Sequence, residues 1–155
     1  TDHASTSSET SFLTIDGKKW ENTIHSDGIA LNPMTDELFY HALTGYSLYA
    51  VPTQVLIEGT EEDIEAAVVN KGKTAAPDGM IFDNKGNLYY ADLEKHQVLR
   101  RTPEGKVETV AEGEEVKWAD TFSIYDDYLY YTNSRIHEAG GDIDALIFSI
   151  KRVKI

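Results

Sequence analysis

The chain has 155 residues, no cysteine and a formal net charge of −13 at pH 7. The lack of cysteine excludes disulfides and thiol chemistry, and the acidic charge disfavours nucleic acid and anionic membrane surfaces as partners. No apolar run approaches the roughly 18 residues that a membrane-spanning helix needs. The acidic surface suits cations, either metal ions or protonated amines, although it also serves simply to keep a protein soluble.

The first 25 residues precede the first regular unit. Residues 1–11 are polar and rich in Ser and Thr, carry no signal peptide, and are expected to be loose. Because the first residue is not Met, we expect a trimmed chain or a fragment. Residues 12–25 are expected to form a lead-in strand. Trp20, and Trp118 further along the chain, are expected to pack as wedges between sheets.

Three stretches of similar layout follow and indicate an internal repeat. Each begins with a small residue or Pro and then Asp, continues through a short apolar run and a turn, and reaches Leu with two aromatic residues. The repeated aspartates are Asp27, Asp78 and Asp120. They are separated by roughly 40–50 residues, the spacing typical of propeller blades built from several short strands.

The second unit has the clearest strand pattern. Its segments GMIFD, NLYYAD, HQVLRRT and KVETVAE are rich in aromatic and β-branched residues and are joined by turns that contain glycine. This pattern predicts one four-stranded antiparallel sheet. In the first unit, Thr60 and Asp63 resemble a capping box, so a short helix is expected near residues 60–69.

These patterns predict an all-β fold: half of a six-bladed propeller, with three four-stranded antiparallel blades and one short helix on the rim. The expected boundaries within a single domain of residues 1–155 are 26–76 for the first blade, 77–118 for the second and 119–155 for the third.

The segment DGIALNPMTDELFYHALTGYSLYAVPTQVL resembles a hallmark stretch of the major royal jelly/Yellow family. FLTIDGKKW resembles the lead-in to that stretch, and KWADTFSIYDDYLYYTNSRIHE resembles a second signature nearer the C-terminus. The resemblance runs from about Phe12 to the end of the chain. It implies the C-terminal half of a six-bladed propeller, and a secreted or periplasmic protein.

A half-propeller leaves two end faces uncovered, and exposed apolar faces of that size promote association. We therefore expect two chains to close a six-bladed ring as a symmetric homodimer. The alternatives are that another chain supplies the missing N-terminal half, or that this chain is a piece of a longer protein.

The segment PDGMIFDNKGNLYYAD is similar to a stretch of the gluconolactonase/regucalcin-like propellers. That resemblance implies that Asp78, and with it Asp27, ligates a divalent metal on the central axis, although the glutamate ligand of that family lies in a blade that this chain lacks. Independently, equivalent positions at the starts of inner strands converge near the axis, and Asp27, Asp78 and Asp120 offer the oxygen ligands that suit Ca²⁺. The alternative is structural, because Asp at the start of a strand often accepts hydrogen bonds from the following backbone. Asp120 fits that role best.

Thr121 and Asn133 are the candidate ligand-binding residues. The Yellow-type resemblance implies that they face a small aromatic amine at the mouth of the channel, where a hydroxyl and a carboxamide accept hydrogen bonds from a protonated amine. Phe122 is expected to stack on the ligand ring or on a cation. The alternative is a β-branched strand residue at Thr121 and a turn cap at Asn133.

The five histidines form no zinc motif, so zinc is not expected. His25, near Asp27, is a candidate general base, whereas His41 is expected to be packed or at the surface. No nucleophile elbow, P-loop or dinucleotide fingerprint occurs, and no catalytic residue is assigned. Three functions remain open: a Yellow-type small-molecule binder with tautomerase-like activity as one option, a Ca²⁺-dependent lactone hydrolase, and a structural or interaction half-propeller without catalysis.

Overall fold

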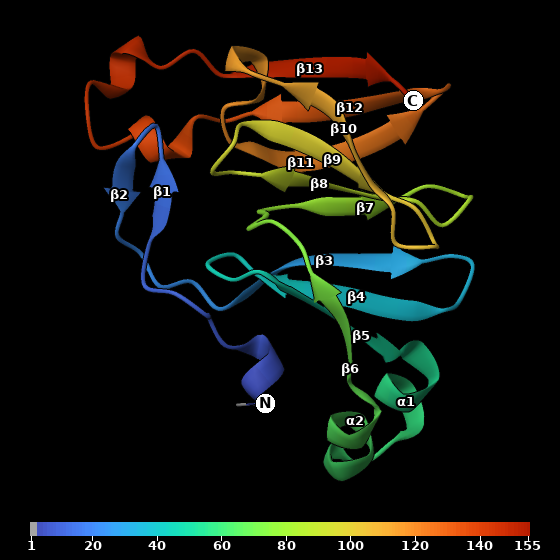
Figure 1. Cartoon of the computed structure of the whole chain (residues 1–155). Helices are drawn as coiled ribbons and strands as arrows, with labels where there is room; N and C mark the ends of the chain where they lie inside the picture. The colour runs from blue at the N-terminus through green and yellow to red at the C-terminus, as the bar shows by residue number, and fades with distance from the viewer. Residues whose placement is uncertain (1–2) are drawn as a thin grey trace.

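Three antiparallel sheets fan out from a common line in the computed structural model, which describes residues 3–155 (Figure 1). The first sheet has the order β3-β4-β5-β6 and the second has the order β7-β8-β9-β10. Their strands are β3 (Ser26–Asn32), β4 (Glu37–Ala42), β5 (Ser47–Pro52), β6 (Val69–Lys73), β7 (Met80–Phe82), β8 (Leu88–Asp92), β9 (Gln97–Arg101) and β10 (Val107–Glu112). This arrangement is the radial blade pattern that the repeat predicts.

The third blade differs from the prediction of four strands. Within residues 3–155 it contains only three, in the order β11-β12-β13. After β12 the chain makes a long connection through two 3-10 turns before β13 pairs with β12. The elements are β11 (Ala119–Tyr125), β12 (Tyr128–Asn133), η3 (Ile136–Glu138), η4 (Ile143–Ala145) and β13 (Ser149–Lys154).

The rim of the first blade carries two helices, α1 (Thr53–Glu58) and α2 (Glu61–Ala67), where one was expected. The capping box that predicts α2 is present: Asp63 N donates to Thr60 Oγ1 at 3.2 Å, and Thr60 N donates to Asp63 Oδ2 at 2.9 Å. α1 lacks a side-chain cap, so it has no capping residue by which its start could be predicted. Over residues 3–155, neither helix has the length and apolar character needed to cross a membrane.

The side chains packed between the blades form two clusters. One lies between the first and second blades and includes Phe39, Leu48 and Tyr90. The other is built around Trp118 and Leu129 and lies between the second and third blades. Each blade is therefore held to its neighbour by apolar side chains that alternate along the strands, as expected for sheets packed face to face.

The N-terminal segment is ordered against the blades, contrary to the expectation of a loose tail and a single lead-in strand. Residues 1 and 2 lie outside the described residues, but Ser5 is buried and its Oγ lies 2.6 Å from Tyr40 Oη on the first blade. Residues 12–25 contain a hairpin of β1 (Leu13–Ile15) and β2 (Lys18–Trp20). Asp16 and Gly17 both take positive φ at its tip, which is the backbone of a two-residue hairpin turn.

Candidate functional site

The inner strands of the three blades lie side by side, with β7 between β3 and β11 (Figure 1). Two glycines make this approach possible. A Cβ added to Gly28 would lie 2.4 Å from the carbonyl oxygen of Asp78, and one added to Gly79 would lie 1.8 Å from the carbonyl oxygen of Asp120. Each Asp-Gly pair thus allows the inner strand of its blade to pack against the aspartate of the next blade.

Asp27, Asp78 and Asp120 are therefore neighbours at the start of the inner strands, and we call them the axial aspartates. Burial raises the pKa of Asp78 to about 7, and the negative charges of Asp120 and Asp27 add to that effect. A hydrogen bond from Trp118 Nε1 to Asp78 Oδ2, 2.6 Å long, opposes it. Burial, followed by the charge of Asp120, also raises the pKa of Asp27.

Mutual repulsion among the axial aspartates makes this position receptive to a cation, which would neutralise carboxylates that now oppose one another. Asp78 accepts its hydrogen bond from an indole in the third blade, so its carboxylate ties two blades together. Asp120 Oδ1 lies 3.4 Å from Thr121 Oγ1, the donor in that contact.

A cavity of about 350 Å³ lies beside Asp120, between the inner strand and the outermost strand of the third blade. Thr121 and Asn133 both line it. Asn133 is buried: its Nδ2 donates to the Glu114 carbonyl at 3.3 Å, and its Oδ1 has no hydrogen-bond partner. The other lining residues are Thr132, Ser134, Phe148, Ser149 and Ile150. We call this hollow the Asn133 cavity.

Phe122 does not line the Asn133 cavity. It pairs with Tyr131 across β11 and β12, and its ring packs against the cluster between the second and third blades. The Phe122 ring lies with Tyr131 on the side of the sheet that packs against the second blade, so it does not reach the hollow that Thr121 lines. The aromatic residue in the cavity wall is Phe148, whose position after a long connection gave no periodic signal in the sequence.

The ring nitrogens of His41 and His25 contact other groups of the fold. His41 is buried and its two ring nitrogens lie 2.6 Å from the Ala42 carbonyl and 2.6 Å from Thr74 Oγ1. Burial lowers the pKa of His41 to about 4, so the ring is neutral near pH 7. The Nδ1 atom of His25 accepts a hydrogen bond from Ser8 N at 3.0 Å, which occupies one of the nitrogens that a general base would use.

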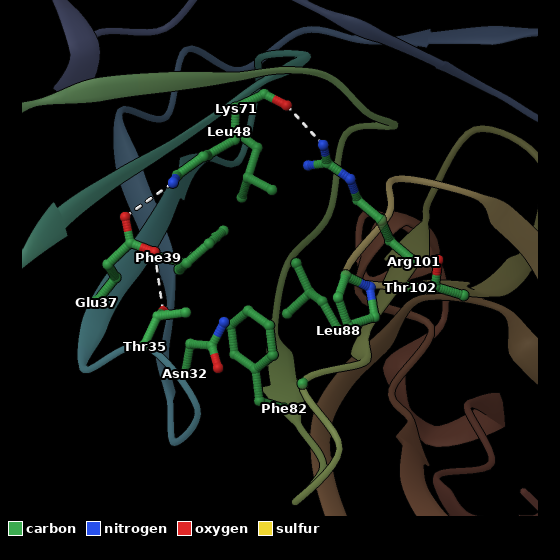
Figure 2. A pocket seen from close by; sticks show the side chains of 12 residues that line it. Asn32, Thr35, Glu37, Phe39, Leu48, Lys71, Phe82, Leu88, Arg101 and Thr102 are labelled. Carbon is green, nitrogen blue, oxygen red and sulfur yellow. Dashed lines mark hydrogen bonds and ion pairs between the residues drawn. The ribbon is translucent and has the colours of Figure 1, made fainter.

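A second cavity, of about 220 Å³, opens at the opposite ends of the strands, between the first and second blades (Figure 2). Phe39 and Phe82 meet edge to face on its floor with ring centroids 4.9 Å apart. Above them, Lys71 Nζ donates to Glu37 Oε1 at 2.8 Å and Arg101 Nη2 donates to the Lys71 carbonyl at 2.7 Å. Lys71 and Glu37 therefore neutralise each other, and Arg101 is held by a backbone carbonyl.

Comparison with solved structures finds propellers that share the fold. A gluconolactonase from Xanthomonas campestris is 14% identical, with a TM-score of 0.62, over 83% of this chain and 43% of that one. A luciferin-regenerating enzyme is 16% identical, with a TM-score of 0.59, over 89% of this chain and 48% of that one. A calcium-binding regucalcin from Agrobacterium tumefaciens is 18% identical, with a TM-score of 0.50, over 91% and 52%.

At the level of sequence, major royal jelly protein 3 of Apis mellifera is 32% identical over 117 residues, which is 66% of this chain and 20% of that protein. The chain thus spans a fifth of that relative and about half or less of the three propellers compared above. The family model described as "Major royal jelly protein" matches residues 2–146. The half-propeller fold and this match agree with the resemblance seen in the sequence, and the chain belongs to the major royal jelly protein family.

Proposed function

We propose that the chain binds a small protonated aromatic amine in the Asn133 cavity at the mouth of the channel. The observation that carries the proposal is the composition of the cavity wall, in which the Asp120 carboxylate, the Asn133 carboxamide and the Phe148 ring meet in one hollow. A carboxylate balances an ammonium charge, a carboxamide oxygen accepts one of its N–H groups, and an aromatic ring offers a face to the ring of the ligand.

The unpartnered Oδ1 of Asn133 supports this assignment. A buried acceptor without a donor costs free energy, and if the carboxamide turned toward the cavity a ligand N–H would restore the missing bond. Phe148 is 63% exposed, so its ring remains available for stacking.

Thr121 stands where the two preceding blades have glycine. In those blades the residue after the axial aspartate is Gly28 or Gly79, and the next blade packs directly on it. A threonine side chain at the equivalent point in the third blade holds any following blade further away. The third blade is therefore built to leave room beside Asp120, where the cavity lies.

Calorimetric titration with dopamine tests the proposal. Asp120→Asn removes the counter-charge with little change in shape, and we expect it to weaken dopamine binding by about tenfold or more. Asp126→Asn is the matched control, because Asp126 is an exposed aspartate in the β11–β12 turn of the same blade. Equal affinity in both variants, or no binding by the unaltered chain at millimolar dopamine, would contradict the proposal.

A second candidate function is a Ca²⁺-dependent lactone hydrolase, favoured by the clustering of the axial aspartates. A bound Ca²⁺ would be held by Asp78 and Asp27 and would supply Lewis-acid polarisation of a carbonyl. The gluconolactonase and the calcium-binding regucalcin that share the fold are themselves described by those activities. Calorimetry with Ca²⁺ discriminates, because binding that disappears in Asp78→Asn supports this function and binding indifferent to that change argues against it.

Export is also a proposal. We infer a secreted or periplasmic location from membership of the major royal jelly protein family. Fractionation of the native host, with detection of this chain by antibody, tests it: a chain confined to the cytosol would refute it.

A further inference from the structure

Four charged or titratable side chains gather beneath the tip of the β1–β2 hairpin. Asp16 comes from the tip itself, Lys117 from the connection between β10 and β11, and His137 and Glu138 from η3. His137 Nε2 lies 3.4 Å from Asp16 Oδ2 and 3.6 Å from Glu138 Oε1. One donor atom from each of Asp16, His137 and Glu138 lies within 4.8 Å of the other two.

His137 is a buried histidine whose hydrogen-bonding capacity is not satisfied. Its side chain is only 6% exposed, yet neither ring nitrogen has a hydrogen-bond partner. The ring stacks on Trp118, with centroids 5.8 Å apart and planes 12° from parallel, which fixes its orientation. A buried imidazole with two unpaired nitrogens is costly, and Nε2 lies close to both carboxylates without a hydrogen bond to either.

We propose that His137 Nε2, Asp16 Oδ2 and Glu138 Oε1 bind a divalent transition-metal ion of the Zn²⁺ type, with water as the fourth ligand. In a tetrahedral zinc site with bonds of about 2.0–2.2 Å, donor atoms are separated by about 3.3–3.6 Å. The two separations from Nε2, 3.4 and 3.6 Å, match that spacing, and the two oxygens lie within 4.8 Å of each other. One nitrogen and two carboxylate oxygens also form a donor set that zinc accepts in proteins.

Neighbouring side chains orient both carboxylates, and Arg135 occupies one lone pair of Glu138 Oε1, so a metal would bind the other lone pair of that oxygen. His96 Nε2 lies 2.7 Å from Asp16 Oδ1, which leaves Oδ2 facing His137. Arg135 donates from Nε to Glu138 Oε2 and from Nη2 to Glu138 Oε1, each at 2.8 Å. Such outer contacts fix the orientation of metal ligands and influence metal affinity.

The position of the Lys117 ammonium group indicates where the fold favours a positive charge. Its ammonium lies 3.5 Å from Asp16 Oδ2 and 3.5 Å from Glu138 Oε1, beside the two proposed oxygen ligands. It also lies 3.3 Å from Glu114 Oε1, which gives it an alternative partner when a metal takes its place. The ammonium is therefore a competitor for the site, and its removal should strengthen metal binding.

The site is open to ions and separate from the Asn133 cavity. A hollow of about 350 Å³ reaches Asp16, His137 and Glu138 from the surface beside Gly140 and Gly141. The sequence contains no zinc motif because the ligands are 121 residues apart in the chain, at Asp16 and His137, and meet only through folding.

The test is a titration of the untagged chain with Zn²⁺ in competition with a chromophoric chelator, and with Co²⁺ followed by its visible absorption. We expect about one equivalent of metal and the intense visible bands of a tetrahedral Co²⁺ centre. His137→Ala and the near-isosteric Glu138→Gln should each weaken binding by at least about tenfold, since each removes a donor atom. His25→Ala is the histidine control, and circular dichroism verifies that each variant folds.

Two further variants test whether Zn²⁺ binds at the proposed ligands and not at the axial aspartates. Lys117→Met should bind Zn²⁺ more tightly than the unaltered chain, and Asp78→Asn should bind it equally well, because Asp78 belongs to the axial aspartates. No stoichiometric binding by the unaltered chain, unchanged affinity in folded His137→Ala, or loss of binding in Asp78→Asn would each overturn the proposal.

Discussion

Trp118 Nε1 donates a 2.6 Å hydrogen bond to Oδ2 of Asp78, so a residue that opens the third blade holds the axial carboxylate of the second. The same indole packs against Trp20 of the hairpin, with ring centroids 4.8 Å apart and planes at 67°. One side chain therefore joins the hairpin, the second blade and the third blade beside the axial aspartates.

The raised pKa of Asp78 makes stability depend on pH. Its folded-state pKa of about 7 lies above the ordinary value of 3.8, so the folded chain binds this proton more tightly than the unfolded chain. Stability attributable to Asp78 is therefore present below about pH 4 and is lost as pH rises toward 7. Asp78→Asn keeps an acceptor for Trp118 without the charge, and at pH 8 we expect it to be more stable by on the order of 3 kcal/mol.

Urea unfolding of both proteins at pH 4 and pH 8, without divalent cations, measures this effect. The advantage of Asp78→Asn should shrink at pH 4, where the unaltered carboxyl is protonated in the folded state. A variant that is less stable than the unaltered chain at pH 8 would show that the charged form is not penalised.

Substitution of Gly79 tests the close approach of the second and third blades. In Gly79→Ala the new Cβ would meet the Asp120 carbonyl oxygen at 1.8 Å, so the inner strands must separate. We expect a loss of about 1–3 kcal/mol or more in the free energy of unfolding. Gly140→Ala is the control, because no heavy atom lies within 4 Å of that added Cβ, and it should change stability by less than about 0.5 kcal/mol.

Asn133→Asp tests the hydrogen-bonding role of Asn133 in amine binding. Asn133→Asp keeps the shape and the Oδ1 acceptor but replaces the Nδ2 donor to the Glu114 carbonyl with a second acceptor oxygen. We expect it to lose stability yet retain dopamine binding, since the carboxylate still accepts from an ammonium group.

Thr121→Gly should reduce dopamine affinity if the threonine preserves the space beside Asp120. Calorimetry of the two variants, with Asp126→Asn as reference, measures both effects, and unchanged affinity in Thr121→Gly would contradict the spacing role.

The two end faces of the fan predict self-association. The first blade exposes Ile29 and Leu31 at 59% and 53%, and Ile29 lines one hollow with Glu65 of α2. The third blade exposes Ile150 at 75% on a strand that also carries Arg152 and Lys154. We propose that the third blade of one copy packs on the first blade of another, which joins opposite charges around apolar centres and closes a ring of two chains.

Light scattering coupled to size exclusion should then report twice the 17.3 kDa of one chain. The double change Arg152→Glu with Lys154→Glu should shift the chain toward the monomer, whereas Lys85→Glu, at an exposed turn residue, should not. A folded monomer of the unaltered chain would refute the second copy as partner and favour a separate N-terminal half.

Sequence periodicity predicted the blades because each inner strand begins with the same Asp-led pattern and each second strand has Leu followed by two aromatic residues. The hairpin of residues 13–20 was missed, although Asp16-Gly17 is a standard signal for a two-residue turn. Phe148 and the grouping of His96 with His137 had no local signal, since they depend on where a long connection crosses the third blade. Phe122 was expected to stack on a ligand, but the structure places it against the cluster between the second and third blades, a position that depends on strand register.

The N-terminal segment touches all three blades in turn, through Ser5 with Tyr40, Thr14 with Glu94, and Asp16 with His137. During synthesis this segment leaves the ribosome long before its last partner, so it cannot settle until nearly the whole chain is available. Contacts between such distant positions form late and slowly in folding. The closing of this strap is therefore expected to be a late step of folding, and a chain stalled before the third blade would carry an uncovered, protease-sensitive hairpin at residues 13–20.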